Sequence, residues 1–367
     1  MNVNYGIVGS GYFGAQEARA LQKIPGATVR GIYDPHNAHK PAREVGADVF
    51  SSAKELINSP DIDAIIVASP NGEHVSPVVE AAKAGKAIFC EKPIALSYRD
   101  CALMVDTARE HEVFFMAGHV MNFMNGVRLA KKIIAEGKLG KVLFVRAVRN
   151  GWEEKQPCVS WKKVRELSGG HLYHHIHELD CVQSILGPAS QATMIGGNVA
   201  HRGEGFGDED DMLLIQLEFP SGAFATLEYG SAFRWPEHYV LIQGDKGAIK
   251  IDMQDTGVTV RIGDREERYL LHRNKEEDDQ RAAIYRNSST DGAVQYGKPD
   301  LLPPLWLKGI VEEEMNYFHT LMQGGSVLEE FAKLSDGSAA MEAIATADAC
   351  TLSLKEDRKV RVCEITG

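Results

Sequence analysis

Tyr5-Gly6-Ile7-Val8-Gly9-Ser10-Gly11-Tyr12-Phe13-Gly14 is the stretch of this sequence that decides its fold. An apolar run ends in three glycines with the spacing GxGxxG, and a helix-compatible segment, residues 15–23, follows at once. In a dinucleotide-binding βαβ unit the first glycine permits a tight turn, the second lets a pyrophosphate approach the backbone, and the third lets helix and strand pack closely. The phosphates then lie at the helix N-terminus, where free N–H groups favour negative charge. Because an ordinary turn can also contain three glycines at this spacing, the surrounding sequence must decide whether this loop binds a dinucleotide.

Length, composition and charge limit the classes of protein that this chain can be. A chain of 367 residues is too long for one hydrophobic core and indicates two domains. A net charge of −11 argues against nucleic acid as a partner. No apolar run approaches the ~20 residues that span a bilayer, and the N-terminus leads directly into a predicted strand without signal-peptide features. We therefore expect a cytoplasmic protein with no membrane partner.

The first 120 residues alternate between short apolar runs and helix-length segments. Strands are expected at 5–9, 28–34, 64–69, 87–90 and 113–117, with helices at about 15–23, 38–45, 76–84 and 98–111. This alternation predicts an α/β domain with a doubly wound parallel sheet, whose ligand crevice lies at the carboxyl ends of the strands.

Asp34 comes at the end of the second predicted strand, twenty positions after Gly14. An acidic side chain there can accept hydrogen bonds from the ribose hydroxyls of adenosine and would repel a 2′-phosphate, which favours NAD over NADP. The alternative is a turn aspartate before Pro35. Strand, glycines, helix, second strand and acid occur in order, so we favour the cofactor interpretation.

Two further stretches are expected at the same crevice. Ser69-Pro70-Asn71-Gly72-Glu73-His74 follows the third predicted strand, and Glu91-Lys92-Pro93 follows the fourth. These residues could instead be turn formers and a solvated ion pair. A lysine close to a nicotinamide would be useful, because burial or a nearby positive charge lowers its pKa towards the range of an acid or base.

With the glycine loop, these two stretches resemble the Gfo/Idh/MocA oxidoreductases, named for glucose-fructose oxidoreductase and inositol dehydrogenase. The resemblance covers the whole chain, and Glu91-Lys92-Pro93 is its most specific part. It implies an N-terminal Rossmann domain, a C-terminal α+β domain with a large open, mainly antiparallel sheet, a tightly held nicotinamide cofactor, homo-oligomers that associate through those sheets, and sugar or polyol substrates. By this resemblance, cofactor binding falls to Gly9, Gly11, Tyr12, Phe13, Gly14, Asp34, Ser69, Asn71, His74, Glu91 and Lys92.

From about residue 123 the pattern changes to consecutive strands with short turns. A helix at 125–137 is followed by expected strands at 141–149, 190–196, 211–219, 223–233, 237–243, 247–252, 257–262 and 267–272. Hairpin turns between them predict an antiparallel sheet, independently of the resemblance. Residues 274–301 are expected to be a long surface loop, followed by helices at about 305–323 and 336–354. The predicted domains are 1–122 for NAD and 123–367 for substrate and oligomerisation, with a last helix that could pack back on the first domain.

Residues 168–187 place four of the thirteen histidines within seven residues. The stretch predicts one helix, opened by glycine and ended by Gly187. On that helix Tyr173 and His177 share a face, and His174 and His177 could converge on one ligand. The alternative is that these histidines occupy polar positions in an interface or on a solvent-exposed face.

In the resembled family this helix carries an Asp and, four residues later, a catalytic His. His177 matches the histidine, whereas Tyr173 occupies the position of the Asp. A tyrosine can hydrogen-bond a substrate hydroxyl, or transfer its proton if Lys92 lowers its pKa. Trp161 resembles a family tryptophan that reaches towards the nicotinamide, the alternative being a buried aromatic anchor.

A metal site is the second interpretation of the histidine cluster, since His174, His177 and Glu178 are possible ligands. Hydride transfer from an alcohol to NAD needs only a base, so no metal is expected. Aromatic and polar loop residues could also line a sugar site; these are His119, Phe123, Trp152, Arg234, Trp235 and His238.

The sequence thus predicts an NAD-dependent oxidoreductase that oxidises a secondary hydroxyl of a sugar, glycoside or polyol, with C3 of a glycoside as one candidate. Lys92 and His177, with Tyr173 or His174, would handle the hydroxyl proton. One alternative is NAD-assisted glycoside cleavage, in which transient oxidation acidifies a neighbouring C–H and allows elimination. Another is a non-catalytic NAD-binding regulator, against which Lys92 and His177 argue, because a binder needs no acid/base set.

Overall fold

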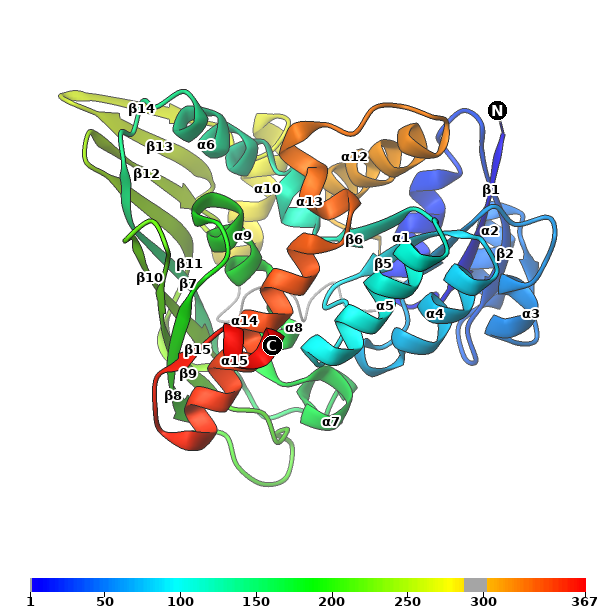
Figure 1. The fold of residues 1–367 in the computed structure, drawn as a ribbon, viewed down its shortest axis with the longest axis horizontal. Coiled ribbons are helices and arrows are strands. Elements are labelled where there is room, and N and C mark those ends of the chain that lie inside the picture. The colour runs from blue at the N-terminus through cyan, green and yellow to red at the C-terminus, as the bar shows by residue number, and fades with distance from the viewer. Residues whose placement is uncertain (1, 287–301) are drawn as a thin grey trace. The chain divides into compact units, whose positions relative to one another are not determined.

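The computed structural model describes residues 2–286 and 302–367 (Figure 1). Within these ranges, residues 2–120 and 302–341 form one compact unit, and residues 121–286 and 342–367 form the second. The chain therefore returns to unit 1 after most of unit 2 is complete.

Unit 1 is built on a parallel sheet with the strand order β3-β2-β1-β4-β5-β6. Its strands are β1 (Val3–Val8), β2 (Ala27–Tyr33), β3 (Asp48–Val49), β4 (Ala64–Val67), β5 (Ala87–Glu91) and β6 (Phe115–Gly118). The order reverses between β1 and β4, so a crevice opens at the carboxyl ends of these two strands. The predicted doubly wound parallel sheet is confirmed, and only the short β3 was missed.

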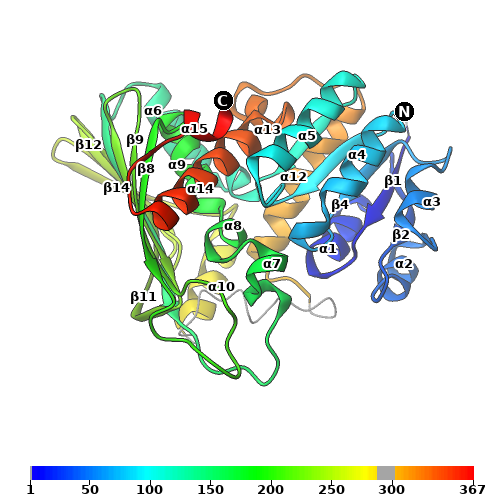
Figure 2. The same cartoon turned by 60° about the horizontal axis from the view of Figure 1, so that its bottom comes forward.

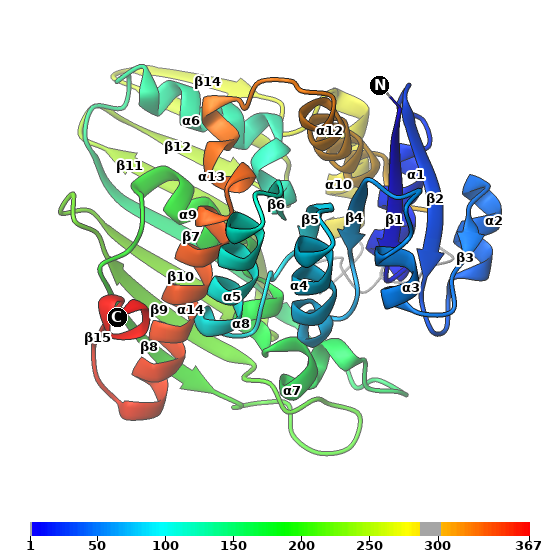
Figure 3. The same cartoon turned by 45° about the vertical axis from the view of Figure 1, so that its right-hand side comes forward.

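Helices cover both faces of this sheet (Figure 3). They are α1 (Tyr12–Leu21), α2 (His39–Val45), α3 (Ala53–Ile57), α4 (Val75–Lys83), α5 (Tyr98–Glu110), α12 (Leu305–Met322) and α13 (Ala332–Ser335). Helix α1 packs with α2 and α12, whereas α4 packs with α3 and α5. Strand residues such as Ile65, Ile66 and Phe89 are fully buried, as expected for a sheet covered on both faces.

Unit 2 is built on a nine-stranded sheet with the order β14-β13-β12-β11-β7-β10-β9-β8-β15 (Figure 2). The strands are β7 (Val142–Trp152), β8 (Gln191–Gly197), β9 (Met212–Glu218), β10 (Phe224–Gly230), β11 (Ala232–Gly244), β12 (Gly247–Asp252), β13 (Gly257–Ile262), β14 (Arg265–Tyr269) and β15 (Val360–Arg361). The predicted large, mainly antiparallel sheet is confirmed. One central pair, β7 and β10, is parallel, and hairpin signals between consecutive strands could not reveal a pairing of strands so distant in sequence.

The helices of unit 2 include two departures from expectation. Among the described residues, its α-helices are α6 (Asn125–Ala135), α7 (Arg165–Ser168), α8 (His171–His174), α9 (His177–Leu186), α10 (Lys275–Arg286), α14 (Ser338–Glu356, which begins in unit 1) and α15 (Cys363–Thr366). The loop expected at 274–301 was wrong for residues 275–286, because α10 buries residues such as Tyr285 despite its polar sequence. Its remainder, 287–301, lies outside the described residues.

The second departure is that the single helix expected between Gly170 and Gly187 is broken at His175. His175 has φ −106° and ψ 39°, outside the helical region. In a continuous helix the Leu179 N–H would bond to the carbonyl of residue 175, but it donates instead to the Tyr229 hydroxyl at 3.0 Å. Histidine is also a weak helix former. Tyr173 and His177 therefore do not share one face of an unbroken helix, and the convergence expected for His174 and His177 cannot be derived from helical spacing.

Among the described residues, no helix is long and apolar enough to cross a membrane.

Candidate active site

The three glycines after β1 have different structural roles. Gly9 has φ 88°, and a Cβ there would lie 2.4 Å from the Ser69 backbone nitrogen. A Cβ on Gly14 would lie 2.0 Å from the Gly9 carbonyl oxygen, so both positions require glycine for the fold itself. Gly11 differs, because a Cβ there would meet nothing within 4 Å. The protein leaves space above Gly11 that its own packing does not use.

This open space lies at the N-terminus of α1, where a dinucleotide pyrophosphate fits. Gly11 is the N-cap of α1, and no side chain caps the helix, so backbone N–H groups of the first turn are available to an anion. Asp34 lies beside the loop, where its Oδ2 accepts from the Ser10 N–H at 2.8 Å. Its Oδ1 accepts from the N–H groups of His36 and Asn37, each at 2.8 Å. Asp34 is thus a turn aspartate that also borders the glycine loop.

His74 joins the two loops that follow β4 and β5. Its Nε2 lies 2.8 Å from the Ser69 carbonyl oxygen and its Nδ1 lies 3.0 Å from that of Pro93. The side chain is fully buried, and burial lowers its pKa, although both carbonyl contacts act in the opposite direction. We therefore interpret His74 as a connection that holds the crevice loops together.

Glu91 and Lys92 lie next to a cluster of buried carboxyl groups in unit 1. Glu17 of α1 and Glu314 of α12 are almost wholly buried, and burial together with the charge of Glu91 raises the pKa of both. Burial also raises the pKa of Glu91, partly offset by its hydrogen bond with Glu17 and by Lys92. Glu91 Oε2 accepts from the Lys92 backbone N–H at 3.1 Å, so this cluster fixes the backbone from which the Lys92 ammonium extends.

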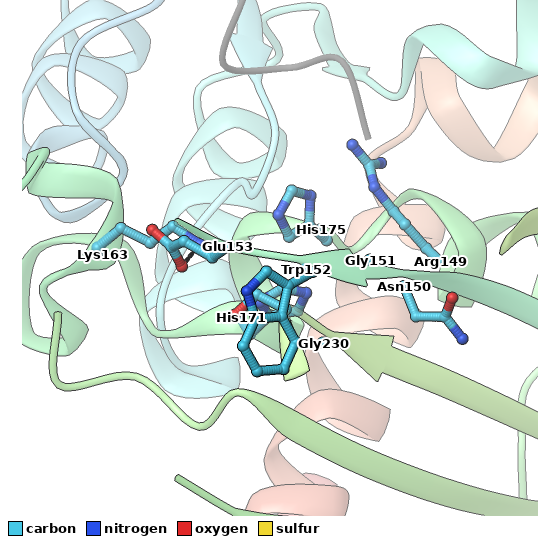
Figure 4. Close-up of a pocket in the computed structure, with 10 residues that line it drawn as sticks. Arg149, Asn150, Gly151, Trp152, Glu153, Lys163, His171, His175 and Gly230 are labelled. Atoms are coloured by element: carbon cyan, nitrogen blue, oxygen red, sulfur yellow. Dashed lines mark ion pairs between the residues drawn. The ribbon is translucent and has the colours of Figure 1, made fainter. Parts of the chain in front are cut away.

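A pocket in unit 2 opens where β7 ends (Figure 4). It contains about 410 Å³ of free space, including its open mouth. Three groups of residues line it. They are Arg149, Asn150, Gly151, Trp152 and Glu153 at the end of β7, Lys163 with His171 and His175 of the histidine-rich segment, and Gly230 and Ser231 between β10 and β11. Lys163 lies just before the histidine-rich segment. A pocket with several imidazole and cationic groups suits an anionic or multiply hydroxylated ligand.

An ion-pair network joins three of the pocket-lining residues to Glu209. Lys163 Nζ lies 2.6 Å from Glu209 Oε1 and 3.0 Å from Glu153 Oε2, and His171 Nδ1 lies 3.6 Å from Glu209 Oε1. Burial alone would raise the pKa of Glu209, but His171 and Lys163 outweigh burial and lower it to about 2. The Lys163 charge is therefore matched by two carboxylates.

His175 lies at the helix break and faces this network. Its ring centroid is 4.5 Å from that of His171 and 4.8 Å from that of His174. Burial, reinforced by the positive charge of Arg149 and neighbouring groups, lowers the pKa of His175 well below its usual range. The lowered pKa favours the neutral imidazole, which can accept a proton but is a weaker base than an ordinary histidine.

Arg149 is held by a second buried network. Its Nη1 lies 3.4 Å from Oε1 of Glu178, and the same oxygen accepts from His238 Nε2 at 2.8 Å. His238 Nδ1 in turn pairs with the Tyr285 hydroxyl at 2.9 Å. Glu178, the carboxylate of the metal alternative, is thus bound to Arg149 and His238. Within residues 2–286 and 302–367, no three His, Cys, Asp or Glu side chains converge as a metal site.

Tyr173 differs from its expected role. Its hydroxyl donates to Asp348 Oδ1 of α14 at 2.5 Å. Burial, with the charge of Asp348, raises the pKa of Tyr173 well above its usual range. The expectation of a lowered pKa is therefore wrong, because the residue beside the phenol is an acid. Tyr173 ties α8 to α14.

The remaining expected residues have varied surroundings. His174 and His177 are half-buried, and the His174 ring lies edge-on to Trp161 at 6.1 Å. His119 and Phe123 are buried, and of the loop aromatics only Trp152 lines the pocket. Sequence reasoning missed His171 and His175, because an unbroken helix would have pointed them elsewhere. It also missed Glu209, because this residue lies in a run of four acidic residues and nothing in the sequence marks it out from its neighbours.

Comparison with known proteins identifies the family. The model described as "Oxidoreductase family, NAD-binding Rossmann fold" matches residues 3–119, and "Oxidoreductase family, C-terminal alpha/beta domain" matches residues 131–362. The chain belongs to the Gfo/Idh/MocA oxidoreductases. Membership confirms the resemblance read from the glycine loop and Glu91-Lys92-Pro93, and with it the NAD cofactor and the oxidoreductase class.

Similar Gfo/Idh/MocA proteins include two hydratases of the same name. A 2,7-anhydro-N-acetylneuraminate hydratase of Mediterraneibacter gnavus is 56% identical over 100% of this chain and 98% of its own length. A hydratase of the same name from Escherichia coli is 54% identical over 99% of this chain and 98% of its own length. Levoglucosan dehydrogenase with NADH and levoglucosan has a TM-score of 0.80 at 22% identity, covering 99% of this chain and 100% of that one, which shows the fold alone.

The glycine loop yields a paired prediction. We expect Gly14→Ala to destabilise unit 1 by about 1–3 kcal/mol, because its Cβ would overlap the Gly9 carbonyl. Gly11→Ala should cost less than about 1 kcal/mol yet weaken NAD binding, since its Cβ enters space meant for the pyrophosphate. Urea unfolding and NADH fluorescence titration measure the two effects. Equal NAD affinity in wild type and Gly11→Ala would contradict the assignment of this space.

The second prediction concerns the buried Glu209. Its pKa falls from 4.5 to about 2 on folding, so the ionised form stabilises the folded state above about pH 4.5, and this stabilisation is lost as the pH falls towards 2. Glu209→Gln should therefore lower the free energy of unfolding by about 3 kcal/mol at neutral pH, with a smaller difference at about pH 3. Urea unfolding across this range provides the test. The exposed Glu166→Gln serves as control, and a pH-independent deficit would rule out charge as the cause.

Proposed function

We propose that this protein adds water across the anhydro bridge of 2,7-anhydro-N-acetylneuraminate, or a close derivative, with NAD reduced and reoxidised in each cycle. The observation that carries this proposal is the identity of 56% and 54% with the two hydratases over essentially the whole chain. The imidazole- and cation-lined pocket of unit 2 supports it, because the substrate is a polyhydroxylated acid. This is the cleavage alternative raised by the sequence, applied to an intramolecular glycoside.

The chemistry of the substrate selects the carbon to be oxidised. The bridge oxygen on C7 must leave C2, whose neighbours are the carboxyl carbon C1 and C3. Only C3 carries a hydrogen whose loss can expel that oxygen, and a ketone on C4 makes this hydrogen acidic. Loss of the C3 proton breaks the C2–O7 bond, and the C7 oxygen takes a proton. Water then adds to C2 while C3 regains a proton, so that return of the hydride to C4 leaves a net addition of one water.

The bound NAD would supply the hydride acceptor and donor at C4. Among the protein's groups, Lys92 is assigned to the C4 hydroxyl, where its ammonium can exchange the proton as the hydroxyl becomes a ketone and back. His175, as a neutral imidazole, is the proposed base for C3–H. His177 and His174 remain proposed partners for the C7 oxygen and the attacking water. Tyr173 is assigned to holding α8, because its pKa is raised.

A simple sugar dehydrogenase is the second candidate. Levoglucosan dehydrogenase of Pseudarthrobacter phenanthrenivorans, 26% identical over 90% of this chain and 92% of its own length, favours it. The difference lies in proton handling, since dehydrogenation needs a base at one hydroxyl only, whereas elimination and hydration need proton sites at C3 and O7 as well.

We also propose that copies associate through the sheet of unit 2, whose strands expose the apolar side chains of Leu143, Ile195 and Phe224.

The third prediction tests the reaction itself. Purified protein with catalytic NAD and 2,7-anhydro-N-acetylneuraminate should release N-acetylneuraminate without accumulating NADH. In D₂O the product should carry deuterium at C3, because the C3 proton passes through the protein and solvent. Product NMR and absorbance of NADH measure both. Stoichiometric NADH with an intact bridge would instead support the dehydrogenase candidate.

The fourth prediction concerns Lys92. Lys92→Met should lower turnover by about 10²–10⁴-fold, the usual contribution of an acid/base group, while NADH affinity changes little because the glycine loop is intact. Lys83→Met, at the exposed end of α4, is the matched control and should leave both unchanged. Normal turnover in Lys92→Met would remove this residue from the proton path.

A further inference from the structure

Strand β11 leaves the β7 ladder beside the pocket. Trp152 pairs with Ala232 and Asn150 pairs with Glu237, so residues 233–236 of β11 stand opposite Gly151 alone. Asn150, Gly151 and Trp152 line the pocket on one side of this bulge, and Gly230 and Ser231 line it just before β11 begins. Bulges re-aim side chains, and this one lets Arg234 stack on Trp152, which lines the pocket.

Arg234 is the cation of this bulge, and it is held by stacking. Its guanidinium carbon lies 3.5 Å from the centroid of the Trp152 ring. Its Nη1 lies 3.8 Å from Glu154 Oε1, and the two side chains are 72% and 75% exposed. Such an exposed pair contributes little, and among the described residues no hydrogen bond to the Arg234 guanidinium is formed. Stacking fixes the plane of the guanidinium and leaves its N–H edges for a ligand.

The other cations around the pocket are already matched by buried acids. Lys163 lies between Glu153 and Glu209 at 3.0 and 2.6 Å. Arg149 lies 3.4 Å from Glu178, which is fully buried. Binding an anion at Lys163 or Arg149 would place it against these carboxylates. Among residues 2–286 and 302–367, Arg234 has no such buried counter-charge, so an incoming anion is favoured there.

We propose that Arg234, held flat on Trp152, binds the substrate carboxylate and selects anionic over neutral anhydro sugars. This inference rests on the proposed function, since the 2,7-anhydro substrate is an acid. A planar guanidinium presents paired N–H donors whose geometry matches a carboxylate. Lysine offers the same charge without the stacking plane or the paired donors.

The test compares the 2,7-anhydro acid with its neutral methyl ester in wild type and variants. Because a charge-assisted hydrogen-bond pair is worth about 10- to 100-fold in binding, Arg234→Met should raise KM for the acid by that factor, with kcat nearly unchanged, and leave KM for the ester unchanged. Arg234→Lys should recover part of the loss. Trp152→Leu, which removes the stacking surface, should raise KM for the acid as Arg234→Met does. Arg265→Met, an exposed arginine on β14, is the control.

Two outcomes overturn the inference. An unchanged KM for the acid in Arg234→Met is one, and an equal loss for acid and ester is the other. If wild type converts neither compound, the proposed function fails, and equilibrium binding of N-acetylneuraminate to the NADH-loaded protein then decides. Weaker binding to Arg234→Met than to wild type supports the carboxylate site, and equal or absent binding overturns it.

Discussion

The pocket of unit 2 depends on one carboxylate that is fully buried. Glu178, in the first turn of α9, is 0% exposed, and an unpaired charge so deep would cost several kcal/mol. Arg149 of β7 and His238 of β11 compensate it at 3.4 and 2.8 Å, and together they lower its pKa against the effect of burial. The Glu178 carboxylate thereby connects α9 to the neighbouring strands β7 and β11. Arg149, which it holds, also lines the pocket.

Pairing of buried charges also determines which forms of Glu209 and His175 are favoured in and beside the pocket. Lys163 and His171 surround Glu209, so the carboxylate remains charged and the positive groups remain in place. Burial disfavours a proton on His175, and the positive charges of Arg149 and Lys163 act in the same direction. The structural ion pairs and the proposed base are therefore parts of one electrostatic arrangement, in which the buried acids hold cations and the cations keep His175 neutral.

The sequence predicted the fold well where local pattern determines structure. The parallel sheet of unit 1 and the hairpins of unit 2 follow from apolar periodicity and turn residues, and Gly9 and Gly14 are required by close backbone contacts that the GxGxxG spacing already implied. The site was less predictable, because its decisive contacts join distant residues. The Tyr173–Asp348 bond fixes the tyrosine, and Glu209 reaches His171 from a separate loop. Neither leaves a signal in local spacing.

The bonded tyrosine at position 173 and the helix break at His175 lie within one short segment. Bonded to Asp348, the side chain at 173 holds its proton and cannot serve as a base, while Tyr229 takes the Leu179 N–H that a continuous helix would use. The break turns His175 into the pocket. His174 and His177 flank His175, the proposed base, in the sequence. A reaction that only oxidises an alcohol gains little from several adjacent imidazoles. A reaction that must move protons at C3, at the bridge oxygen and at water has a use for each of them.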